Sequence, residues 1–225
     1  EPPPILTVSQ WAEKYRFLSP ESSSQRGKFR LAITPYAKEW MDAANDPNVQ
    51  TVCLMVASQL GKTESLNNVV GYFMQADPAP ILMVQPTVEM AEAWSKERLV
   101  PMVRDTPCLT PLVKEAKSRD SGNTIRMKSF PGGNIAVVGA NAPSGLAGRP
   151  RRVVLLDEVD RPDGGTGREG DFCALAIRRT ESFWNSVIYL TSTPTIKEAS
   201  RIESEFEQTD KRKWFCPCPV CGHEQ

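Results

Sequence analysis

The chain has 225 residues, of which 40% are hydrophobic and 24% charged, so it can bury a sizeable core. Lys plus Arg and Asp plus Glu balance at 27 each, and this neutrality argues neither for nor against a nucleic-acid partner. No apolar run approaches the roughly 18 residues of a membrane span, and the first residues lack the pattern of a signal peptide. We therefore expect no membrane partner. The missing initial Met and the end at Gln225 lead us to expect a piece of a longer protein.

The first part of the chain predicts two helices separated by a loop. Residues 9–15 have a helical pattern, and residues 19–29, rich in Ser and in charge, are typical of a loop. A second helix is expected over 34–46, with Thr34 as the N-cap and Pro35 at the first helical position.

Apolar runs that alternate with helical patterns occupy the rest of the chain. The run 49–57 predicts a strand buried on both faces, and a helix follows from 62 to about 74. Residues 123–130 and 134–140 predict a β-hairpin. Further buried strands are expected at 79–87, 152–158 and 186–195, further helices at 88–103 and 170–183, and a polar helix or linker at 200–214. This alternation predicts an α/β fold with a mainly parallel sheet.

A short glycine-lysine motif lies between the strand expected at 49–57 and the helix that follows it. A phosphate-binding loop needs backbone N–H groups at a helix N-terminus, a lysine that reaches the β- and γ-phosphates, and a hydroxyl that holds Mg²⁺. Lys62 and Thr63 fit these roles. The full motif G-x-x-x-x-G-K-[ST] requires glycine where this chain has Val56, so an ordinary strand–turn–helix is the alternative. The residues expected to contact ATP are Ser58, Gln59, Leu60, Gly61, Lys62, Thr63 and Glu64.

Two adjacent acids end the strand expected at 152–158. Ligands bind at the carboxyl edge of open α/β sheets, and Asp157 and Glu158 lie there. Asp157 is predicted to hold Mg²⁺ and Glu158 to polarise a water for attack on the γ-phosphate. A solvated strand end is the alternative, but paired carboxylates are costly to bury without a cation.

Hydroxyl side chains end the strand expected at 186–195 and are candidates for sensing the γ-phosphate; an ordinary polar strand end is the alternative. These residues are Thr191, Ser192 and Thr193. Gln85 and Thr87 end another strand and are expected near a nucleic-acid path or as a simple cap.

Basic residues in the loop before the acidic strand are candidates for contacting DNA phosphates or a neighbouring subunit's ATP. Arg149 is the first candidate for such an arginine finger, beside Arg151 and Arg152, and Arg178 and Arg179 are rivals. A solvated run of charge is the alternative.

Three of the six cysteines lie together near the end of the chain. Cys218 and Cys221 have the spacing and the following glycine of a zinc-binding turn. Cys216 and His223 are nearby, but four ligands within so short a segment would be strained, so we expect the second pair of ligands beyond Gln225. The scattered Cys53, Cys108 and Cys173 are predicted to be reduced, packed thiols.

Taken in order, the segments "ASQLGKTE", "LLDEVDR", "EGDFCALAIRRT", "TSTPT", "SRIESEF" and "CPVCGHEQ" resemble the lambda-type (GpA-type) phage terminase large subunit. The resemblance implies a P-loop NTPase fold, RecA-like and of the additional-strand, catalytic-glutamate class. It implies an N-terminal segment at 1–45, an ATPase domain at 46–205, and at 206–225 a linker with the start of a zinc-binding or nuclease region.

The resemblance also implies roles and partners. The phosphate-loop lysine falls on Lys62, the Mg²⁺ ligands on Thr63 and Asp157, the catalytic acid on Glu158, and a contact with adenine on Tyr36. Many such proteins carry an arginine in the phosphate loop, where this chain has Gln59. The implied activity is ATP-driven movement of double-stranded DNA into a procapsid in the host cytoplasm, by a homo-oligomeric ring with a small terminase subunit and a portal. A nuclease domain is expected to follow.

Two other functional classes share these features. A helicase-like translocase has the same strand-end motifs, but 225 residues leave no room for a second RecA-like domain. A non-catalytic zinc or nucleic-acid-binding module with a decayed nucleotide site is favoured by Val56 alone. A metabolic kinase fits less well, because the adjacent acids suit a water nucleophile.

Overall fold

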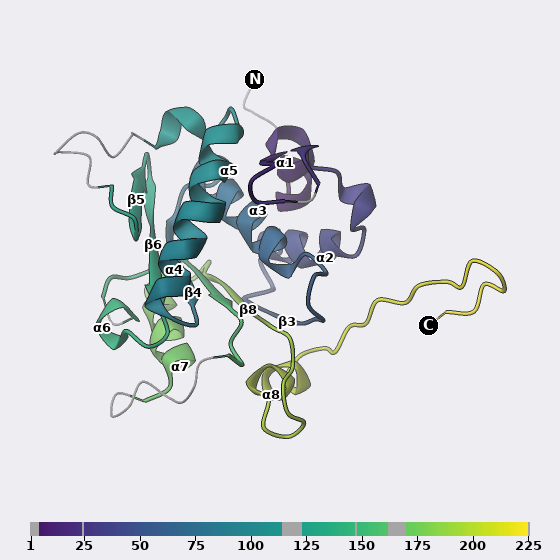
Figure 1. Ribbon diagram of the computed structural model, residues 1–225. Helices are drawn as coiled ribbons and strands as arrows, with labels where there is room; N and C mark the ends of the chain where they lie inside the picture. The colour runs from purple at the N-terminus through teal and green to yellow at the C-terminus, as the bar shows by residue number, and fades with distance from the viewer. Residues whose placement is uncertain (1–4, 24, 114–122, 147, 162–169, 225) are drawn as a thin grey trace.

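A six-stranded sheet carries the fold of the computed structural model, which describes residues 5–23, 25–113, 123–146, 148–161 and 170–224. The strand order is β3 (Thr51–Met55), β8 (Val187–Ser192), β7 (Val153–Asp157), β4 (Pro80–Gln85), β6 (Gly133–Gly139) and β5 (Met127–Phe130) (Figure 1). All pairs are parallel except β5 with β6. The predicted mainly parallel sheet and the hairpin are therefore confirmed.

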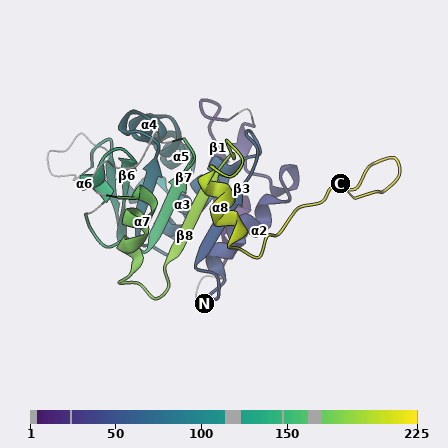
Figure 2. The same cartoon turned by 90° about the horizontal axis from the view of Figure 1, so that it is seen from below.

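Helices cover both faces of the sheet (Figure 2). The first face packs against α1 (Val8–Tyr15), α2 (Ala37–Asp42), α3 (Lys62–Gln75) and the continuous run of α4 (Val88–Trp94), the π-helical turn η3 (Ser95–Leu99) and α5 (Val100–Asp105). The second face packs against α6 (Pro143–Leu146), α7 (Phe172–Ile177) and α8 (Arg201–Glu207). The short elements are β1 (Phe17–Leu18), β2 (Gly27–Lys28) and the 3₁₀ turns η1 (Leu31–Ile33), η2 (Ala43–Asn45), η4 (Thr110–Leu112) and η6 (Arg178–Thr180).

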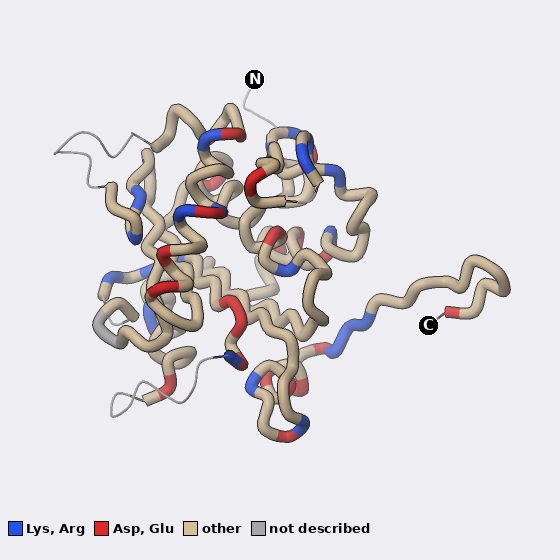
Figure 3. The backbone as a smooth tube through the Cα atoms, viewed as in Figure 1, with Lys and Arg blue, Asp and Glu red and all other residues tan. Residues whose placement is uncertain are grey.

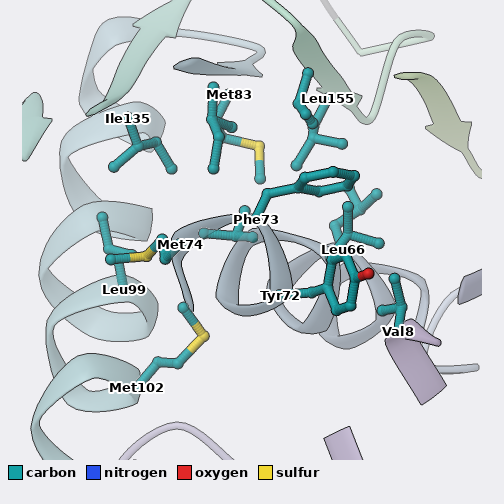
Figure 4. Packing of buried hydrophobic residues seen from close by; sticks show 14 of the residues in the cluster. Val8, Leu66, Tyr72, Phe73, Met74, Met83, Leu99, Met102, Ile135 and Leu155 are labelled. Atoms are coloured by element: carbon teal, nitrogen blue, oxygen red, sulfur yellow. The ribbon is translucent and has the colours of Figure 1, made fainter. Parts of the chain in front are cut away.

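Alternating side chains of the central strands enter two separate cores. On β7, Leu155 points to the core around α3, while Leu156 points to the core around α7. Phe73 of α3 packs near Met83 and Leu155 (Figure 4). Since successive side chains of a strand face opposite sides, a strand between two helical layers must be apolar throughout. The prediction of buried strands at β4, β7 and β8 is confirmed.

The first strand departs from its prediction. We expected β3 to be buried on both faces, but it lies at the edge of the sheet and pairs only with β8. Its burial is incomplete: Leu54 is buried and Thr51 is exposed. The apolar composition of β3 reflects its packing against flanking helices, since α8 lies against it and Cys53 Sγ is 3.8 Å from the Ile202 carbonyl oxygen.

Two helix boundaries also differ from the prediction. The helix expected from Thr34 begins at Ala37, because Thr34 ends the preceding η1 turn with its N–H bonded to the Leu31 carbonyl. The C-terminal helix ends at Glu207, and the segment that follows, to residue 216, forms neither helix nor strand.

Described residues between 8 and 41 share a core with the sheet. Trp11 of α1 is fully buried, and its Nε1 donates to Gln75 Oε1 at 2.8 Å. Its ring lies against Gly71, where an added Cβ would be 2.3 Å from Trp11 Cη2. A glycine at this helical position therefore lets α1 pack closely on α3, the helix that begins at the phosphate-binding motif.

Charge is spread over the surface with both signs interspersed, and the segment after α8 carries the basic run 211–213 (Figure 3). Among the helices that the structure describes, none is long and apolar enough to cross a bilayer.

Candidate active site

The turn between β3 and α3 brings a helix N-terminus to the carboxyl edge of the sheet. Gln59 and Gly61 have left-handed backbones, with φ of 64° and 80°. Gly61 occupies this region without strain, and it caps α3. The first N–H groups of this 14-residue helix have no partner within the helix and carry a partial positive charge. The turn therefore has the features of an anion-binding loop.

Lys62 is held at the centre of the site. Its side chain is 6% exposed, and its Nζ lies 2.9 Å from Glu158 Oε1. The same ammonium donates to Thr193 Oγ1 at 3.2 Å. The lysine of the phosphate-binding motif, the acid that follows β7 and the hydroxyl that follows β8 are thus brought together at one edge of the sheet.

Asp157 is buried in a network of hydrogen bonds. Its Oδ1 accepts from Thr191 Oγ1 at 2.7 Å, and its Oδ2 accepts from Thr63 Oγ1 at 3.2 Å and from Gln85 Nε2 at 3.4 Å. Burial raises the pKa of this carboxyl, and the adjacent charge of Glu158 adds to the rise, although the hydrogen bonds oppose it. A buried carboxylate beside a hydroxyl is a hard oxygen pair of the kind that Mg²⁺ prefers.

Glu158 has a strained backbone and a carboxylate oxygen without a hydrogen-bond donor among the described residues. Its φ is 55°, a left-handed value that is rare outside glycine and clusters at functional sites. The side chain is 13% exposed, and Arg161 Nε lies 3.3 Å from Oε2. Among the described residues no group donates a hydrogen bond to this buried Oε2, so it retains the capacity to accept one from a water.

A cavity of about 310 Å³ adjoins the loop. Its lining includes Gln59, Gly61, Lys62 and Thr63 of the phosphate-binding motif. The remaining lining residues are Ser22, Ser23, Glu64, Asn67 and Arg98. The cavity thus joins the N-terminal loop to the motif.

The other predicted contacts are placed as follows. Ser58 and Leu60 are exposed in the loop, and the Tyr36 hydroxyl donates to the Leu60 carbonyl at 3.2 Å. Glu64 turns away from Lys62, because its carboxylate is bound by Arg16 at 2.7 Å and by Asn67 Nδ2 at 3.1 Å.

The arginines expected to contact DNA phosphates or a neighbouring subunit's ATP are divided between two environments. Arg151 is buried and donates to the Ile81 carbonyl at 3.2 Å, while Arg152 pairs with Asp77 at 2.6 Å. Both precede β7 and therefore lie at the opposite end of the strands from Asp157. Their contacts there stabilise the fold. Arg149 is exposed. Arg179 Nε donates to the Leu175 carbonyl at 3.3 Å, and Arg178 is exposed.

The cysteine segment forms a small turn. The Cys218 N–H donates to the His223 carbonyl, and the Gly222 N–H donates to the Cys218 carbonyl, both at 2.8 Å. Gly222 has a φ of 74°. Within the described part of the chain, no group of three or more His, Cys, Asp or Glu side chains is arranged to hold a metal.

The sequence matches the family described as phage terminase large subunit gpA, ATPase domain, over residues 23–225. The chain belongs to this family. It is 31% identical to the terminase large subunit of Enterobacteria phage P21 and 27% identical to that of Escherichia phage lambda, over 100% and 99% of its length. It spans 35% of the length of either relative.

Two solved terminases are similar in structure to this terminase ATPase domain. A mutant of the Thermus phage P74-26 large terminase ATPase domain is 22% identical, with a TM-score of 0.49, over 70% of this chain and 64% of that chain. A large terminase from a thermophilic bacteriophage is 16% identical, with a TM-score of 0.46, over 70% of this chain and 37% of that chain.

The strand order places β8 between β3, which leads into the phosphate-binding loop, and β7, which leads into the acidic pair. The predicted P-loop NTPase fold and the resemblance to the lambda-type terminase are both confirmed.

Sequence reasoning missed three residues around the terminase site. Arg98 and Asn67 line the cavity, and Arg161 pairs with Glu158. No sequence pattern marked them; Arg98 lies in the π-helical turn η3, a feature frequent at functional sites that the structure alone reveals. Gln85, expected near a nucleic-acid path or as a cap, donates to Asp157 instead.

Proposed function

We propose that this ATPase domain hydrolyses ATP to move double-stranded DNA into a procapsid. The observation that carries the proposal is the meeting of four side chains, two from the end of β7 and two from the start of α3 at the phosphate-binding loop. Lys62 contacts Glu158 at 2.9 Å, and Thr63 contacts Asp157 at 3.2 Å. A lysine, a hydroxyl and two acids at one helix N-terminus are the set that triphosphate hydrolysis requires.

Glu158 acts as the general base in this proposal. Its carboxylate accepts a proton from a water whose oxygen attacks the γ-phosphorus. The bond between the γ-phosphorus and the bridging oxygen breaks, and that oxygen leaves with ADP. The buried Oε2, which accepts no hydrogen bond from the described residues, supports this role.

Thr63 and Asp157 would hold Mg²⁺, which when bound neutralises charge on the phosphate oxygens. The Thr191 hydroxyl orients Asp157 through its 2.7 Å hydrogen bond. Of the three hydroxyl residues at the end of β8, Thr193 is the one that contacts Lys62, so we assign the sensing of the γ-phosphate to Thr193. Ser192 donates to the Thr193 carbonyl at 3.1 Å and supports it.

Replacing Glu158 with Gln tests the catalytic assignment. The variant keeps the size of the side chain and loses the base, so ATP binding should persist while turnover falls by at least about 100-fold. Glu181→Gln, an exposed glutamate in the turn before β8, is the matched control and should keep wild-type turnover. Wild-type turnover in Glu158→Gln would overturn the assignment.

Two rival functions are distinguished by simple assays. A helicase-like translocase would separate the strands of a forked duplex, whereas a packaging motor leaves them paired. A non-catalytic module would bind labelled ATP no better than its Lys62→Ala variant. The Lys62–Glu158 contact favours the catalytic function over the second rival.

The partners are assigned on the names of the relatives, which are terminase large subunits. We assign a small terminase subunit, a portal on the procapsid and a homo-oligomeric ring, acting in the host cytoplasm. The full-length protein, mixed with procapsids, small subunit and ATP, should protect DNA from nuclease digestion, and Glu158→Gln should not.

Arg149 is assigned to the ATP of a neighbouring subunit. Its exposure leaves it accessible to such a partner, whereas Arg151 and Arg152 are engaged in the fold. Arg179 remains the alternative. Arg149→Ala mixed with Lys62→Ala should recover turnover if one subunit supplies the arginine and the other the site; two inactive proteins that stay inactive together would reject the assignment.

Three further assignments concern the base side of the nucleotide, a zinc site and a nuclease region. Tyr36, bonded to the phosphate loop through Leu60, is assigned to the base side of the nucleotide. Cys218 and Cys221 are assigned as half of a zinc site that other residues of the full-length protein complete. A nuclease region would follow. Zinc in the full-length protein at one equivalent, lost in Cys218→Ser, would support the second assignment; zinc unaffected by Cys218→Ser would reject it.

A further inference from the structure

The carboxylate of Asp160, close behind Glu158 in the chain, binds the segment that follows β8. Its Oδ2 accepts from Thr195 N and Thr195 Oγ1, both at 3.2 Å, and from Ser200 Oγ at 2.5 Å. Its Oδ1 accepts from Ile202 N at 2.8 Å. One side chain therefore fastens both ends of the 195–202 segment, which leads into α8.

The backbone around Asp160 is the turn that carries Glu158. The Arg161 N–H donates to the Glu158 carbonyl at 3.0 Å and closes the turn. The Val159 N–H donates to the Thr191 carbonyl at 3.1 Å, and the Asp160 N–H donates to Ser192 Oγ at 3.3 Å. The left-handed Glu158 is thus held between the end of β8 and the segment bound by Asp160.

The segment 195–202 follows directly after the phosphate site. Thr193 accepts from Lys62, and Ser200 caps α8 through the N–H of Glu203 at 3.2 Å. Ile202 is fully buried on the second face of the sheet. A closed set of contacts therefore runs from Lys62 through Thr193 to α8, and returns through Asp160 to Glu158 and Lys62.

A left-handed non-glycine residue persists only where its surroundings over-determine it. Hydrogen bonds to a charged carboxylate are stronger than those between neutral groups, so Asp160 is the strongest attachment of this turn outside the sheet. The Glu158 carboxylate can activate a water only in one orientation, because general-base catalysis depends on hydrogen-bond geometry.

We propose that Asp160 is a positioning residue that fixes the Glu158 turn to the N-terminus of α8, so that the placement of α8 sets the orientation of the catalytic carboxylate. This proposal rests on the proposed ATPase function. It gives the chain that continues from α8 a direct mechanical connection to the hydrolysis step.

The test measures ATP turnover and unfolding of the full-length protein carrying Asp160→Asn. We expect kcat to fall about tenfold or more, since small displacements of a catalytic group have effects of this size, with KM for ATP within about twofold of wild type. The control is Asp171→Asn, which breaks the 2.7 Å ion pair that also anchors α8 at Arg201 but leaves the Glu158 turn untouched. It should lower the unfolding temperature and keep kcat within about twofold.

A milder variant keeps the test independent of folding. Thr195→Val removes one donor to Asp160 from an exposed position and should lower kcat about twofold to fivefold at unchanged KM. Wild-type kcat in both Asp160→Asn and Thr195→Val would overturn the proposal. So would equal losses of kcat in Asp160→Asn and Asp171→Asn, because they would mark a structural role only.

A double variant separates this proposal from the function on which it rests. If Asp160 acts through Glu158, adding Asp160→Asn to Glu158→Gln should lower the residual turnover no further. A further tenfold loss would overturn the positioning role while leaving Glu158 catalytic. Wild-type turnover in Glu158→Gln alone would instead reject the proposed function.

Discussion

Lys62 and Glu158 form an ion pair across the site, with Nζ 2.9 Å from Oε1. Both side chains are largely buried, at 6% and 13% exposure. The lysine that is expected to bind the phosphates is therefore already paired with the acid that is expected to activate the attacking water. A triphosphate must compete with that acid for the ammonium, and this competition leads to the first prediction.

Glu158→Gln should bind ATP at least as tightly as the wild-type protein. Removing the negative charge frees Lys62 for the phosphates, and an interaction of about 1 kcal/mol corresponds to roughly fivefold tighter binding. Equilibrium binding of a fluorescent ATP analogue would measure the change. Weaker binding than wild type would show that the ion pair does not compete with the nucleotide.

Gly71→Ala should destabilise the protein, against the usual trend. In a helix interior, Gly→Ala normally stabilises by about 0.5–1 kcal/mol. Here the new Cβ would lie 2.3 Å from Trp11 Cη2, and overpacking of this kind costs about 1–3 kcal/mol. Urea unfolding would give the sign.

Trp11→Phe in the Gly71→Ala background is the control for that contact. The smaller ring leaves room for the new methyl, so the two changes together should destabilise less than the sum of the single changes. Strict additivity would mean that the clash is relieved elsewhere.

Stability should depend on pH through Asp42. Burial alone would raise the pKa of this carboxyl, but hydrogen bonds from Ser9 N, Ser9 Oγ and Lys38 outweigh it and hold the pKa below its ordinary value of 3.8. An acid with a lowered folded pKa contributes stability above its unfolded pKa and loses it as pH falls through the folded pKa. The contribution is therefore complete at neutral pH and disappears in acid below 3.8.

Asp42→Asn isolates this contribution. The variant should be less stable than wild type by about 1 kcal/mol at neutral pH, and the difference should shrink below the ordinary pKa of the carboxyl. Urea titrations at neutral and acidic pH would measure it. A difference that is constant with pH would assign the loss to packing.

Thiol reagents should distinguish the cysteines. Burial raises the pKa of Cys173 and of Cys53 to about 12, so neither is a thiolate near neutral pH. The backbone N–H groups of Cys221 and Val220 instead lower the pKa of Cys218. After treatment with a chelator, iodoacetamide should label Cys218 well before Cys173, as peptide mass spectrometry would record. Comparable labelling of Cys173 in the folded protein would contradict the burial.

Much of the site was predictable from the sequence because its residues end apolar runs. Asp157 and Thr191 follow strands that are apolar on both faces, and parallel strands bring such ends to one edge. The position of β3 was not predictable, since an edge strand packed against helices has the same apolar pattern as a central one. The pairing of Arg151 and Arg152 inside the fold was also hidden, because a basic loop looks alike whether its side chains face solvent or a carboxylate.

The role of Asp160 lies furthest from sequence reasoning. In the chain it is one more acid in a charged stretch. Its partners Thr195, Ser200 and Ile202 become its neighbours only when β8 is inserted beside β7. Local patterns report which residues end a strand, whereas such contacts depend on the order of strands in the sheet.

That order has a consequence for how the motif residues communicate. Strands stand about 4.8 Å apart, so β8 sets β3 and β7 about 10 Å from each other. Lys62 reaches towards the acidic strand from the phosphate-binding loop, and its Nζ contacts both Thr193, which follows β8, and Glu158, which follows β7. A sideways shift of β8 by a fraction of an ångström would therefore change two things at the same time. It would move the Lys62 ammonium relative to the phosphates, and it would change the orientation of the water that Glu158 activates.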